Sequence, residues 1–334
     1  MFTPYDDRKS EIPFASAEYI SFASRNSFLG CPAVTMDNMG DGDVVIVGAP
    51  FDWGTTYRPG ARFGPAAIRN ADYGAMDGSR PHLQTGLDPF EVLGVVDIGD
   101  VYVHPGQLEG SIDRIADVVT DVARAGQVPI VLGGDHTITW PDAMGVARAH
   151  GFGDVALIHF DAHADTGFTQ NGGLIGHGTP MRRLIESGAV PGHRFVQIGL
   201  RGYWPEPEVL EWMREHKMRS FMMNEIVARG LDDVVDEAVN YSLEGGAKGV
   251  FISVDIDVVD PGLAPGTGTP EPGGLNSRET LDTVRRLSRD LNVLGADVVE
   301  VSPPYDGPGG QTAYLANRIV LEIMNGMAER KTSD

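Results

Sequence analysis

The sequence predicts an α/β fold, a three-layer α/β/α sandwich in which helices cover both faces of a central, mainly parallel sheet. Apolar runs that fit buried strands alternate along the chain with amphipathic stretches that fit helices. Several of these runs are continuously apolar, which is typical of strands covered on both faces. The expected strands are Val44–Gly48, Val92–Ile98, Val128–Gly133, Val155–Phe160, Phe195–Gly199, Phe251–Asp255 and Val293–Val299.

Helical periodicity fills the stretches between these strands. Strands that alternate with helices favour a parallel sheet, and chemistry in such folds lies beyond the carboxyl ends of the strands. No Ser/Gly linker, repeat or low-complexity tract divides the 334 residues. We therefore expect a single domain over residues 1–334, with residues 1–43 as an N-terminal extension packed on it. The expected helices are Ser111–Ala125, Trp140–His150, Pro207–His216, Leu231–Leu243, Ser277–Leu291 and Ala313–Ala328.

The composition restricts the partners and the compartment. A formal charge of −21 without a Lys/Arg patch argues against nucleic acid and favours a cationic small molecule, although an acidic surface also serves solubility alone. The single cysteine, Cys31, excludes a disulfide framework and suits a reducing compartment. The N-terminus carries Asp6 and Asp7 where a signal peptide has bases, and no apolar run reaches about 18–20 residues. We expect a cytoplasmic protein without a membrane partner.

Two short acidic stretches carry the strongest functional signal. Asp161, His163 and Asp165 directly follow one apolar run, and Asp255 and Asp257 follow another. Residues at i, i+2 and i+4 of an extended chain point the same way, so these side chains would leave two strand ends on a common side. Carboxylates gathered there would repel one another strongly unless cations lay between them. The spacing predicts a metal site for two ions.

A further candidate ligand is His136, which follows the glycine turn Gly133-Gly134-Asp135 at the end of a strand. On its own it could equally be a core or helix-start histidine, just as Asp255 and Asp257 could cap the next helix. Oxygen and nitrogen ligands without thiolate favour Mn²⁺ over zinc, with Fe, Co or Ni as alternatives. A binuclear site lowers the pKa of a bridging water, so that hydroxide can attack an electrophilic carbon. The residues thus indicate a metal-assisted hydrolase and leave the electrophile open.

Three blocks of the sequence resemble the signature motifs of the ureohydrolases, the arginase/agmatinase superfamily. They are Gly133–His136, Asp161–Asp165 and Ser253–Pro261. The resemblance covers nearly the whole chain in family order, from residues 48–65 through 264–274 to Glu300–Pro303. It implies an arginase-like sandwich around a sheet of about eight strands, two divalent metal ions, and a homo-oligomer that is trimeric or hexameric.

The resemblance also implies a role for each matched residue. By this likeness His136 and Asp165 would bind one metal ion, His163 and Asp257 the other, and Asp161 and Asp255 would bridge them. Asp165 would in addition accept a hydrogen bond from the bridging hydroxide.

Two more residues match positions that handle the substrate in this family. Glu300 resembles the guanidinium-binding carboxylate, whose two oxygens suit parallel N–H bonds, although alone it could be a salt-bridge residue. His177 matches the histidine proposed to carry protons to the leaving amine, and its alternative role is packing at the mouth of the site. Together they imply hydrolysis of a guanidino compound to urea and an amine.

The substrate tail is less determined by the sequence. The loop 166–175 lacks the Asn and the Ser-Gly pattern with which arginases hold the amino-acid head of arginine, and Arg58–Arg62 is similar to the agmatinase-like branch. The loop 168–177 has no basic residue to bind a carboxylate. Agmatine, hydrolysed to putrescine and urea, is the first expectation. Guanidinobutyrate, guanidinopropionate, and guanidine or another small guanidine with nickel as the metal are alternatives, and the branch also resembles proclavaminate amidinohydrolase.

Aromatic residues near these loops are candidates for the tail pocket. Trp204 and Phe168 could shape it, as could Trp53, and Arg201–Pro205 could line the entrance, but aromatic residues more often simply pack. Two other classes of protein are alternatives for the function of this chain. An inactive partner subunit of an active paralogue should have lost ligands that this chain keeps. A phosphate-directed metallohydrolase would want Lys, Arg or a glycine-rich cradle near the metals.

Overall fold

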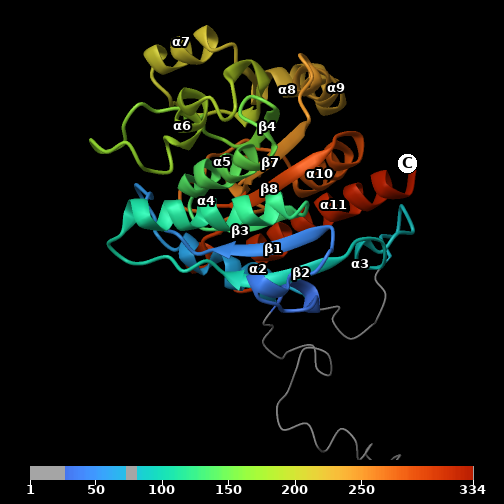
Figure 1. Cartoon of the computed structure of the whole chain (residues 1–334). Helices are drawn as coiled ribbons and strands as arrows, with labels where there is room; N and C mark the ends of the chain where they lie inside the picture. Colours follow the sequence, from blue (N-terminus) through green and yellow to red (C-terminus); the bar gives the residue numbers. More distant parts are fainter. Residues whose placement is uncertain (1–26, 73–80, 334) are drawn as a thin grey trace, which may run out of the picture.

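A computed structural model describes residues 27–72 and 81–333. Within them, one eight-stranded sheet runs in the order β2-β1-β3-β8-β7-β4-β5-β6, and every adjacent pair is parallel. Helices lie on both sides of this sheet (Figure 1). The predicted α/β/α sandwich with a parallel sheet is confirmed. Residues 1–26 of the expected N-terminal extension lie outside the described residues.

The strands are short, and all but the edge strands β2 and β6 are almost entirely buried. They are β1 (Val44–Ala49), β2 (Val95–Asp100), β3 (Val128–Gly133), β4 (Val155–Phe160), β5 (Phe195–Leu200), β6 (Arg219–Met222), β7 (Gly249–Asp255) and β8 (Val293–Val299). The helices are α2 (Gly64–Asn70), α3 (Pro89–Val92), α4 (Leu108–Arg124), α5 (Thr139–His150), α6 (Pro180–Ser187), α7 (Pro207–Glu215), α8 (Met223–Arg229), α9 (Leu231–Leu243), α10 (Ser277–Asp290) and α11 (Gln311–Ser333).

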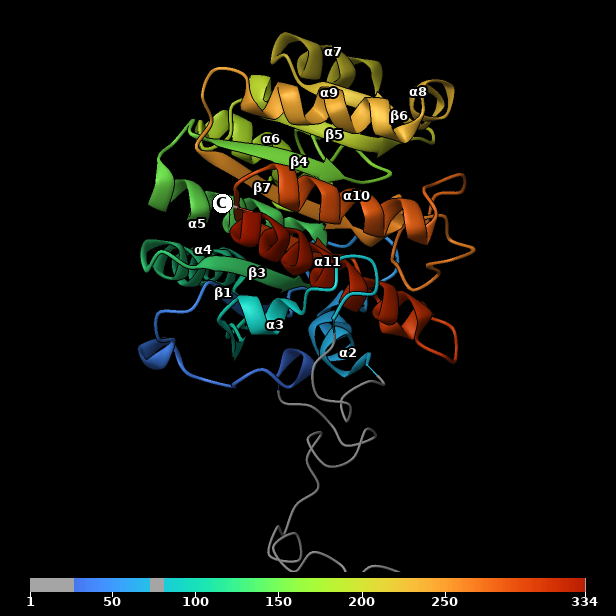
Figure 2. The ribbon, with the colours of Figure 1, turned by 90° about the vertical axis from the view of Figure 1, so that its right-hand side faces the viewer.

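Every strand except the edge strand β6 contributes side chains to two separate cores, one on either face of the sheet. Along β1, Val44 and Ile46 belong to the core beneath α10 and α11, while Val45 and Val47 belong to the core beneath α4 and α5. Figure 2 shows α9, α10 and α11 side by side on the first face. This arrangement explains the continuously apolar strands, because both faces of the pleat are removed from water.

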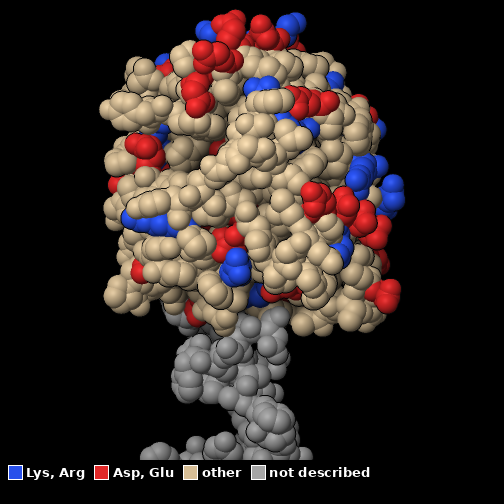
Figure 3. Space-filling view, turned by 90° about the vertical axis from the view of Figure 1, so that its left-hand side faces the viewer, with Lys and Arg blue, Asp and Glu red and all other residues tan. Residues whose placement is uncertain are grey.

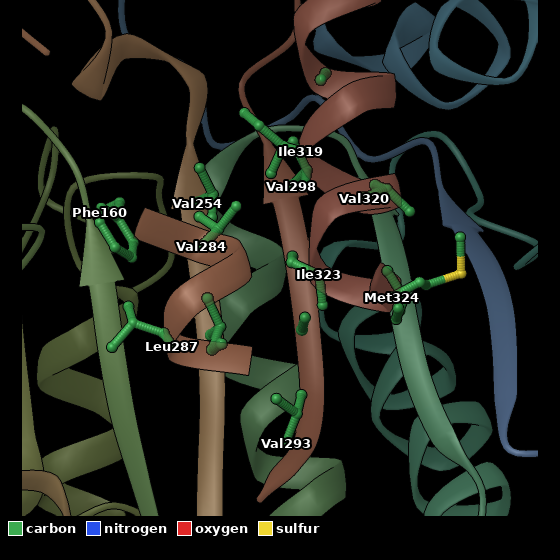
Figure 4. Close-up of a cluster of buried hydrophobic side chains, with 14 of the residues drawn as sticks. Phe160, Val254, Val284, Leu287, Val293, Val298, Ile319, Val320, Ile323 and Met324 are labelled. Carbon is green, nitrogen blue, oxygen red and sulfur yellow. The ribbon is translucent and has the colours of Figure 1, made fainter. Parts of the chain in front are cut away.

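The core under α10 and α11 is built from aliphatic side chains that interdigitate across the layers (Figure 4). Leu287 of α10 and Ile323 of α11 meet Val254 of β7 and Val298 of β8 there, and all four are fully buried. The packed pair of α10 and α11 thus supports the two central strands β7 and β8 on one face of the sheet. Those strands end at the site described below.

The structure departs from the expected elements in a few places. The strand expected to begin at Val92 begins at Val95, because residues 89–92 form α3, with Pro89 in its first turn and Asp88 capping it. Strand β6 was not predicted, since only Phe221 of its four residues is buried and Arg219 opens it. Helices α2, α6 and α8 were also not predicted, because each is only seven or eight residues long.

Candidate functional site

The candidate residues gather where four neighbouring strands end. Strands β3, β8, β7 and β4 lie side by side in the sheet, and all point the same way. His136 follows β3, Glu300 follows β8, Asp255 closes β7 and Asp161 follows β4. Residues that are up to 164 positions apart in the sequence therefore meet at one edge of the sheet, where His136 N–H donates to Glu300.

A first group of ligand atoms surrounds the ring of His136. Its Nδ1 lies 3.0 Å from Oδ2 of Asp161, 3.0 Å from Oδ2 of Asp165 and 3.0 Å from Oδ2 of Asp255. Its other ring nitrogen, Nε2, lies 3.1 Å from the hydroxyl of Ser253, which fixes the ring so that Nδ1 faces the carboxylates. His136, Asp161, Asp165 and Asp255 are all buried.

A second group lies beside the first and shares Asp161 with it. His163 Nδ1 is 3.1 Å from Oδ2 of Asp257 and 3.5 Å from Oδ1 of Asp161. Asp161 therefore presents one oxygen to each group, as a bridging carboxylate does. Asp255 presents Oδ2 to the first group, while its Oδ1 accepts the backbone N–H of Asp257 at 2.8 Å. Asp255 thus caps the short helix Ile256–Val258 and is at the same time a candidate metal ligand.

The spacing of these atoms fits divalent cations. Adjacent ligands of an octahedral ion with bonds of about 2.1 Å lie about 3.0 Å apart, which is the separation around His136 Nδ1. Oδ2 of Asp257 is buried and accepts no hydrogen bond of good geometry from the described residues, with Nδ1 of His163 3.1 Å away. A buried carboxylate oxygen with so little hydrogen bonding is costly, and a cation beside it would remove that cost. The residues present fit two metal ions.

The electrostatics of the protein alone point the same way. Burial raises the pKa of Asp255 well above its usual range, and the carboxylates of Asp257 and Asp161 raise it further. Burial lowers the pKa of His136, but its interactions with the acceptor oxygens of Asp161, Asp165 and Asp255 outweigh burial and raise that pKa well above its ordinary value. The cluster therefore stabilises positive charge at its centre strongly.

Strained backbone holds two of the site residues. Asp165 has φ 51° and Glu300 has φ 60°, in the left-handed region that non-glycine residues rarely adopt. The turn before His136 needs a glycine for a different reason. A Cβ on Gly134 would lie 1.9 Å from the carbonyl oxygen of Phe51, so no other residue fits between the two loops. The packing of the surrounding fold maintains this strained backbone and thereby orients the side chains of Asp165 and Glu300.

Glu300 and His177 form the other half of the site. Oε1 of Glu300 lies 2.9 Å from Nδ1 of His177 and accepts the backbone N–H of His136 at 2.8 Å. Nε2 of His177 lies 2.8 Å from the hydroxyl oxygen of Thr56, to which a protonated ring can donate, and 3.2 Å from the backbone nitrogen of Thr56, while Nδ1–H points to Glu300. Oε2 of Glu300 is buried and has no hydrogen-bond partner among the described residues. It is free to accept from a ligand.

Both groups have shifted pKa values. Burial lowers the pKa of His177, but the charge of Glu300 and its hydrogen bond, together with Asp165 and Asp135, raise it to about 9. For Glu300, burial raises the pKa, but His177 and the N–H of His136 outweigh it and lower the pKa below its usual value. Glu300 is thus an anion and His177 a cation near neutral pH.

A cavity of about 300 Å³ opens above both halves of the site. Five of its lining residues are candidate site residues, and most of the others have uncharged polar side chains. It is lined by Thr56, His163, Asp165, Thr169, Gln170, His177, Gly178, Trp204, Asp255 and Thr269. No Lys or Arg side chain lines this cavity in the described part of the structure.

The aromatic candidates have different positions. Trp204 lines the cavity, with its ring over Gly167 and Gly178. Phe168 does not line it and is 60% exposed, with Arg182 5.7 Å from its ring centre. Trp53 packs edge-on against Phe51 at 5.2 Å instead of facing the cavity. Of these residues, only Trp204 is placed to touch a substrate tail.

Arg201, expected at the entrance, braces the site from outside. Its guanidinium donates to the backbone carbonyls of Asp257 and Glu271, each at 2.6 Å. It thereby ties the strand end that carries Asp257 to the 264–274 loop. Four functional candidates escaped sequence reasoning: Thr56, Gln170, His159 and Gln197 have no distinctive spacing, and only the fold shows their contacts.

In the described part of the chain, the distribution of surface charge and the character of the helices do not point to a further binding site. On the face in Figure 3, basic and acidic side chains occur in small separate groups on a largely uncharged surface. Among the described helices, none combines the length and the apolar character that a membrane span requires.

Comparison with known proteins agrees with this geometry. Residues 42–326 match the model of the arginase family. The chain is 42% identical over 285 residues to proclavaminate amidinohydrolase of Streptomyces clavuligerus, covering 84% of this chain and 87% of that protein. It is 39% identical over 318 residues to guanidinopropionase of Pseudomonas aeruginosa, covering 95% and 96%. Agmatinase of Gallus gallus is 41% identical over 284 residues, covering 84% and 80%.

Solved structures agree as well. The proclavaminate amidinohydrolase structure from Streptomyces clavuligerus superimposes with a TM-score of 0.85 at 39% identity, covering 93% of this chain and 99% of that one. A formiminoglutamase of Trypanosoma cruzi with Mn²⁺ superimposes with a TM-score of 0.79 at 27% identity, covering 88% and 96%.

Proposed function

The chain belongs to the arginase family, and from that premise we propose that it hydrolyses a guanidino compound to urea and an amine at a centre of two divalent metal ions. A hydrolase of this family acting on guanidino compounds is consistent with the amidinohydrolase, the guanidinopropionase and the agmatinase described above. The observation that carries the proposal is the buried, ionised carboxylate of Glu300. Its Oε1 lies 2.9 Å from Nδ1 of the protonated His177, and its Oε2 has no hydrogen-bond partner among the described residues. This carboxylate stands beside the two ligand groups.

His136 and Asp165 would hold one metal ion and His163 and Asp257 the other, with Asp161 and Asp255 shared between them. The bridging role of Asp255 expected from the resemblance is part of this proposal. Bound there, the ions lower the pKa of a water molecule so that hydroxide is available near neutral pH. Oxygen-rich ligation without thiolate supports Mn²⁺, with Ni²⁺ and Co²⁺ as alternatives.

The residues above the metals would recognise and protonate the substrate. The free oxygen of Glu300 accepts N–H bonds from the planar guanidinium and places its carbon over the ligand groups. His177, held as a cation by Glu300, donates a proton to the leaving amine nitrogen. Thr56 keeps the His177 ring in place through its Nε2.

Agmatine is the proposed substrate. The described lining of the cavity has no Lys or Arg to pair with a carboxylate tail, and Asp165 and Glu300 favour a cation. Guanidinopropionate, guanidinobutyrate and small substituted guanidines are the alternatives. Relatives at similar identity carry different substrates in their names, so similarity alone does not choose among them.

The test is urea release after metal stripping, with Mn²⁺, Ni²⁺ or Co²⁺ added back. The panel contains agmatine, 4-guanidinobutyrate, 3-guanidinopropionate, arginine and guanidine. Urea from agmatine with a kcat/KM at least tenfold above the acids supports the proposal. Faster hydrolysis of an acid overturns the choice of tail but keeps the reaction. No urea from any member, with metal bound, overturns the reaction and favours the inactive-partner alternative.

The proposal includes a cytoplasmic homo-oligomer, trimeric or hexameric. Light scattering coupled to size-exclusion chromatography measures its mass directly against the 35.9 kDa of one chain. A monomeric mass would contradict this part alone.

A further inference from the structure

A further buried side chain lies beside the candidate metal ligands and has no role in the chemistry above. His159 of β4 is fully buried, and its Nε2 lies 2.8 Å from Oδ2 of Asp161. We propose that His159 is a positioning residue: its Nε2–H donates to Asp161 and aims that carboxylate at the metal ions, in a tautomer that Gln197 imposes. This inference rests on the metal sites of the proposed function and not on the identity of the substrate.

The orientation of the Gln197 amide decides the tautomer. One amide atom of Gln197 lies 2.8 Å from the carbonyl oxygen of Ala164 and 3.1 Å from Nδ1 of His159. A carbonyl oxygen only accepts, so the Gln197 atom beside Ala164 is the nitrogen. The other end of the amide, Oε1, accepts from the hydroxyl of Ser220 at 2.9 Å, which agrees with this orientation. Gln197 is therefore a donor toward both of its partners.

A donor facing Nδ1 leaves that nitrogen without a hydrogen. The hydrogen of a neutral imidazole must then lie on Nε2, where it points at Oδ2 of Asp161. The two hydrogens of the Gln197 amide are both used, one on Ala164 and one on His159. The chain of contacts thus determines which end of the His159 ring donates.

The same contacts separate His159 from the metal ligands. Ligand atoms of His136, His159 and Asp161 lie within 4.8 Å of one another, which is close enough for a shared ion. Coordination through Nε2 of His159 would move its hydrogen to Nδ1, where it would face the N–H of Gln197 at 3.1 Å. Two donors at that distance repel. His159 therefore lies outside the coordination sphere, whereas Nδ1 of His136 faces only carboxylates.

Gln197 reaches both ends of the ligand-bearing turn. Through His159 it acts on Asp161, and through the Ala164 carbonyl it holds the peptide between His163 and Asp165. Gln197 comes from the neighbouring strand β5, and its own side chain is fully buried. Loss of such an outer partner of a metal ligand typically costs about 10–100-fold in metal affinity or activity.

The experiment compares Mn²⁺ binding by metal-stripped full-length variants, measured by isothermal titration calorimetry. His159→Phe removes the donor and keeps a ring, whereas His159→Gln keeps an N–H at a similar reach. We expect His159→Phe to weaken the affinity for at least one Mn²⁺ by about 10–100-fold, and His159→Gln to restore it to within a few-fold of wild type. A purely structural role would lower the unfolding temperature of the metal-free protein without this difference between the two variants.

Unchanged Mn²⁺ affinity in His159→Phe overturns the proposal, and so does an equal loss in both variants. If His159→Phe fails to fold, Gln197→Met is the second variant. It removes the amide N–H that keeps the hydrogen of His159 on Nε2, and it leaves His159 itself in place. Wild-type affinity in Gln197→Met would overturn the role of Gln197. A wild-type protein that binds Mn²⁺ but releases no urea overturns the proposed reaction and leaves this comparison valid.

Discussion

Oε1 of Glu300 and Nδ1 of His177 lie 2.9 Å apart, although 123 positions separate these residues in the sequence. The contact keeps the carboxylate ionised and the imidazole protonated, since each stabilises the charge of the other. It also leaves the second oxygen of Glu300 free within the described structure. In the proposed reaction, this one pair would supply both the anion that binds the guanidinium and the acid that protonates the leaving amine.

Glu300→Gln should abolish most activity while keeping the metals. The amide can still accept the N–H of His136, so the fold around the site is retained. It cannot accept charge-assisted bonds from a guanidinium, and two such bonds at about 1.5–3 kcal/mol each correspond to a loss of roughly 10²–10⁴ in kcat/KM. Metal content by elemental analysis should stay at the wild-type value. Activity within tenfold of wild type would contradict the assignment of Glu300.

The pH profile should show an alkaline limb that belongs to His177. A general acid works only while protonated, so kcat should fall as the pH rises through the pKa of His177, which is about 9 in the protein alone. Cations beside Asp165 would offset part of the charge that raises this pKa, which places the limb at or below pH 9. His177→Asn should lose the limb and roughly 10² or more of the rate. An identical limb in His177→Asn would assign it to another group.

Asp255→Asn separates capping from metal binding at a single residue. Asparagine caps a helix as well as aspartate does, so the bond from the Asp257 N–H should survive. The metal-free variant should be at least as stable as wild type, because a buried carboxylate crowded by Asp257 and Asp161 has been neutralised. We expect fewer than two metal ions per chain and a loss of at least about 100-fold in urea release. Full metal content and a wild-type rate would refute its role as a ligand.

Trp204 should set the preference for the substrate tail. Its ring forms one wall of the cavity over Gly167 and Gly178. Trp204→Ala should raise KM for the best substrate by about tenfold, since the contact of an aromatic ring with a ligand contributes about 1–2 kcal/mol. Phe168→Ala is the matched control, because Phe168 does not line the cavity. Equal effects of the two substitutions on the substrate panel would rule out a specific role for Trp204.

A buried acid pair outside the site should make stability depend on pH. Burial raises the pKa of Asp142 on α5 well above its usual range, and the charge of Asp297 on β8 raises it further. A raised folded-state pKa stabilises at low pH, and that stability is lost as the pH rises toward the folded-state value. Asp142→Asn removes this loss. Its free energy of unfolding relative to wild type should therefore increase in urea titrations as the pH rises above about 4, the ordinary pKa of an aspartate; a constant difference would contradict the shift.

Much of the fold could be predicted because the signal is local. Strands β3, β4 and β8 have the predicted bounds, since continuous apolar runs between turns mark strands buried on both faces. Strand β6 could not be found this way, because a short edge strand that opens with Arg219 buries too little to show a pattern. Edge strands face solvent, and the hydrophobic signal weakens there.

The candidate site divides in the same manner. The alternation in 161–165 and 255–257 gave the ligand types and a common direction, because the strand period is two residues. That His136 faces Asp161, Asp165 and Asp255 depends on the order β3-β8-β7-β4, which no local pattern contains. Strand order follows from how the whole chain buries its apolar surface.

The sequence by itself therefore determined the class of fold, the chemistry of the ligands and the family resemblance, all of which reside in short stretches of residue types. Only the tertiary structure decided which of these stretches meet, that Thr56 holds His177, and that Gln197 selects the tautomer of His159. The physical reason is that such contacts join strands and loops far apart in the chain. Their geometry is fixed by packing, whereas a sequence pattern reports only on its neighbours.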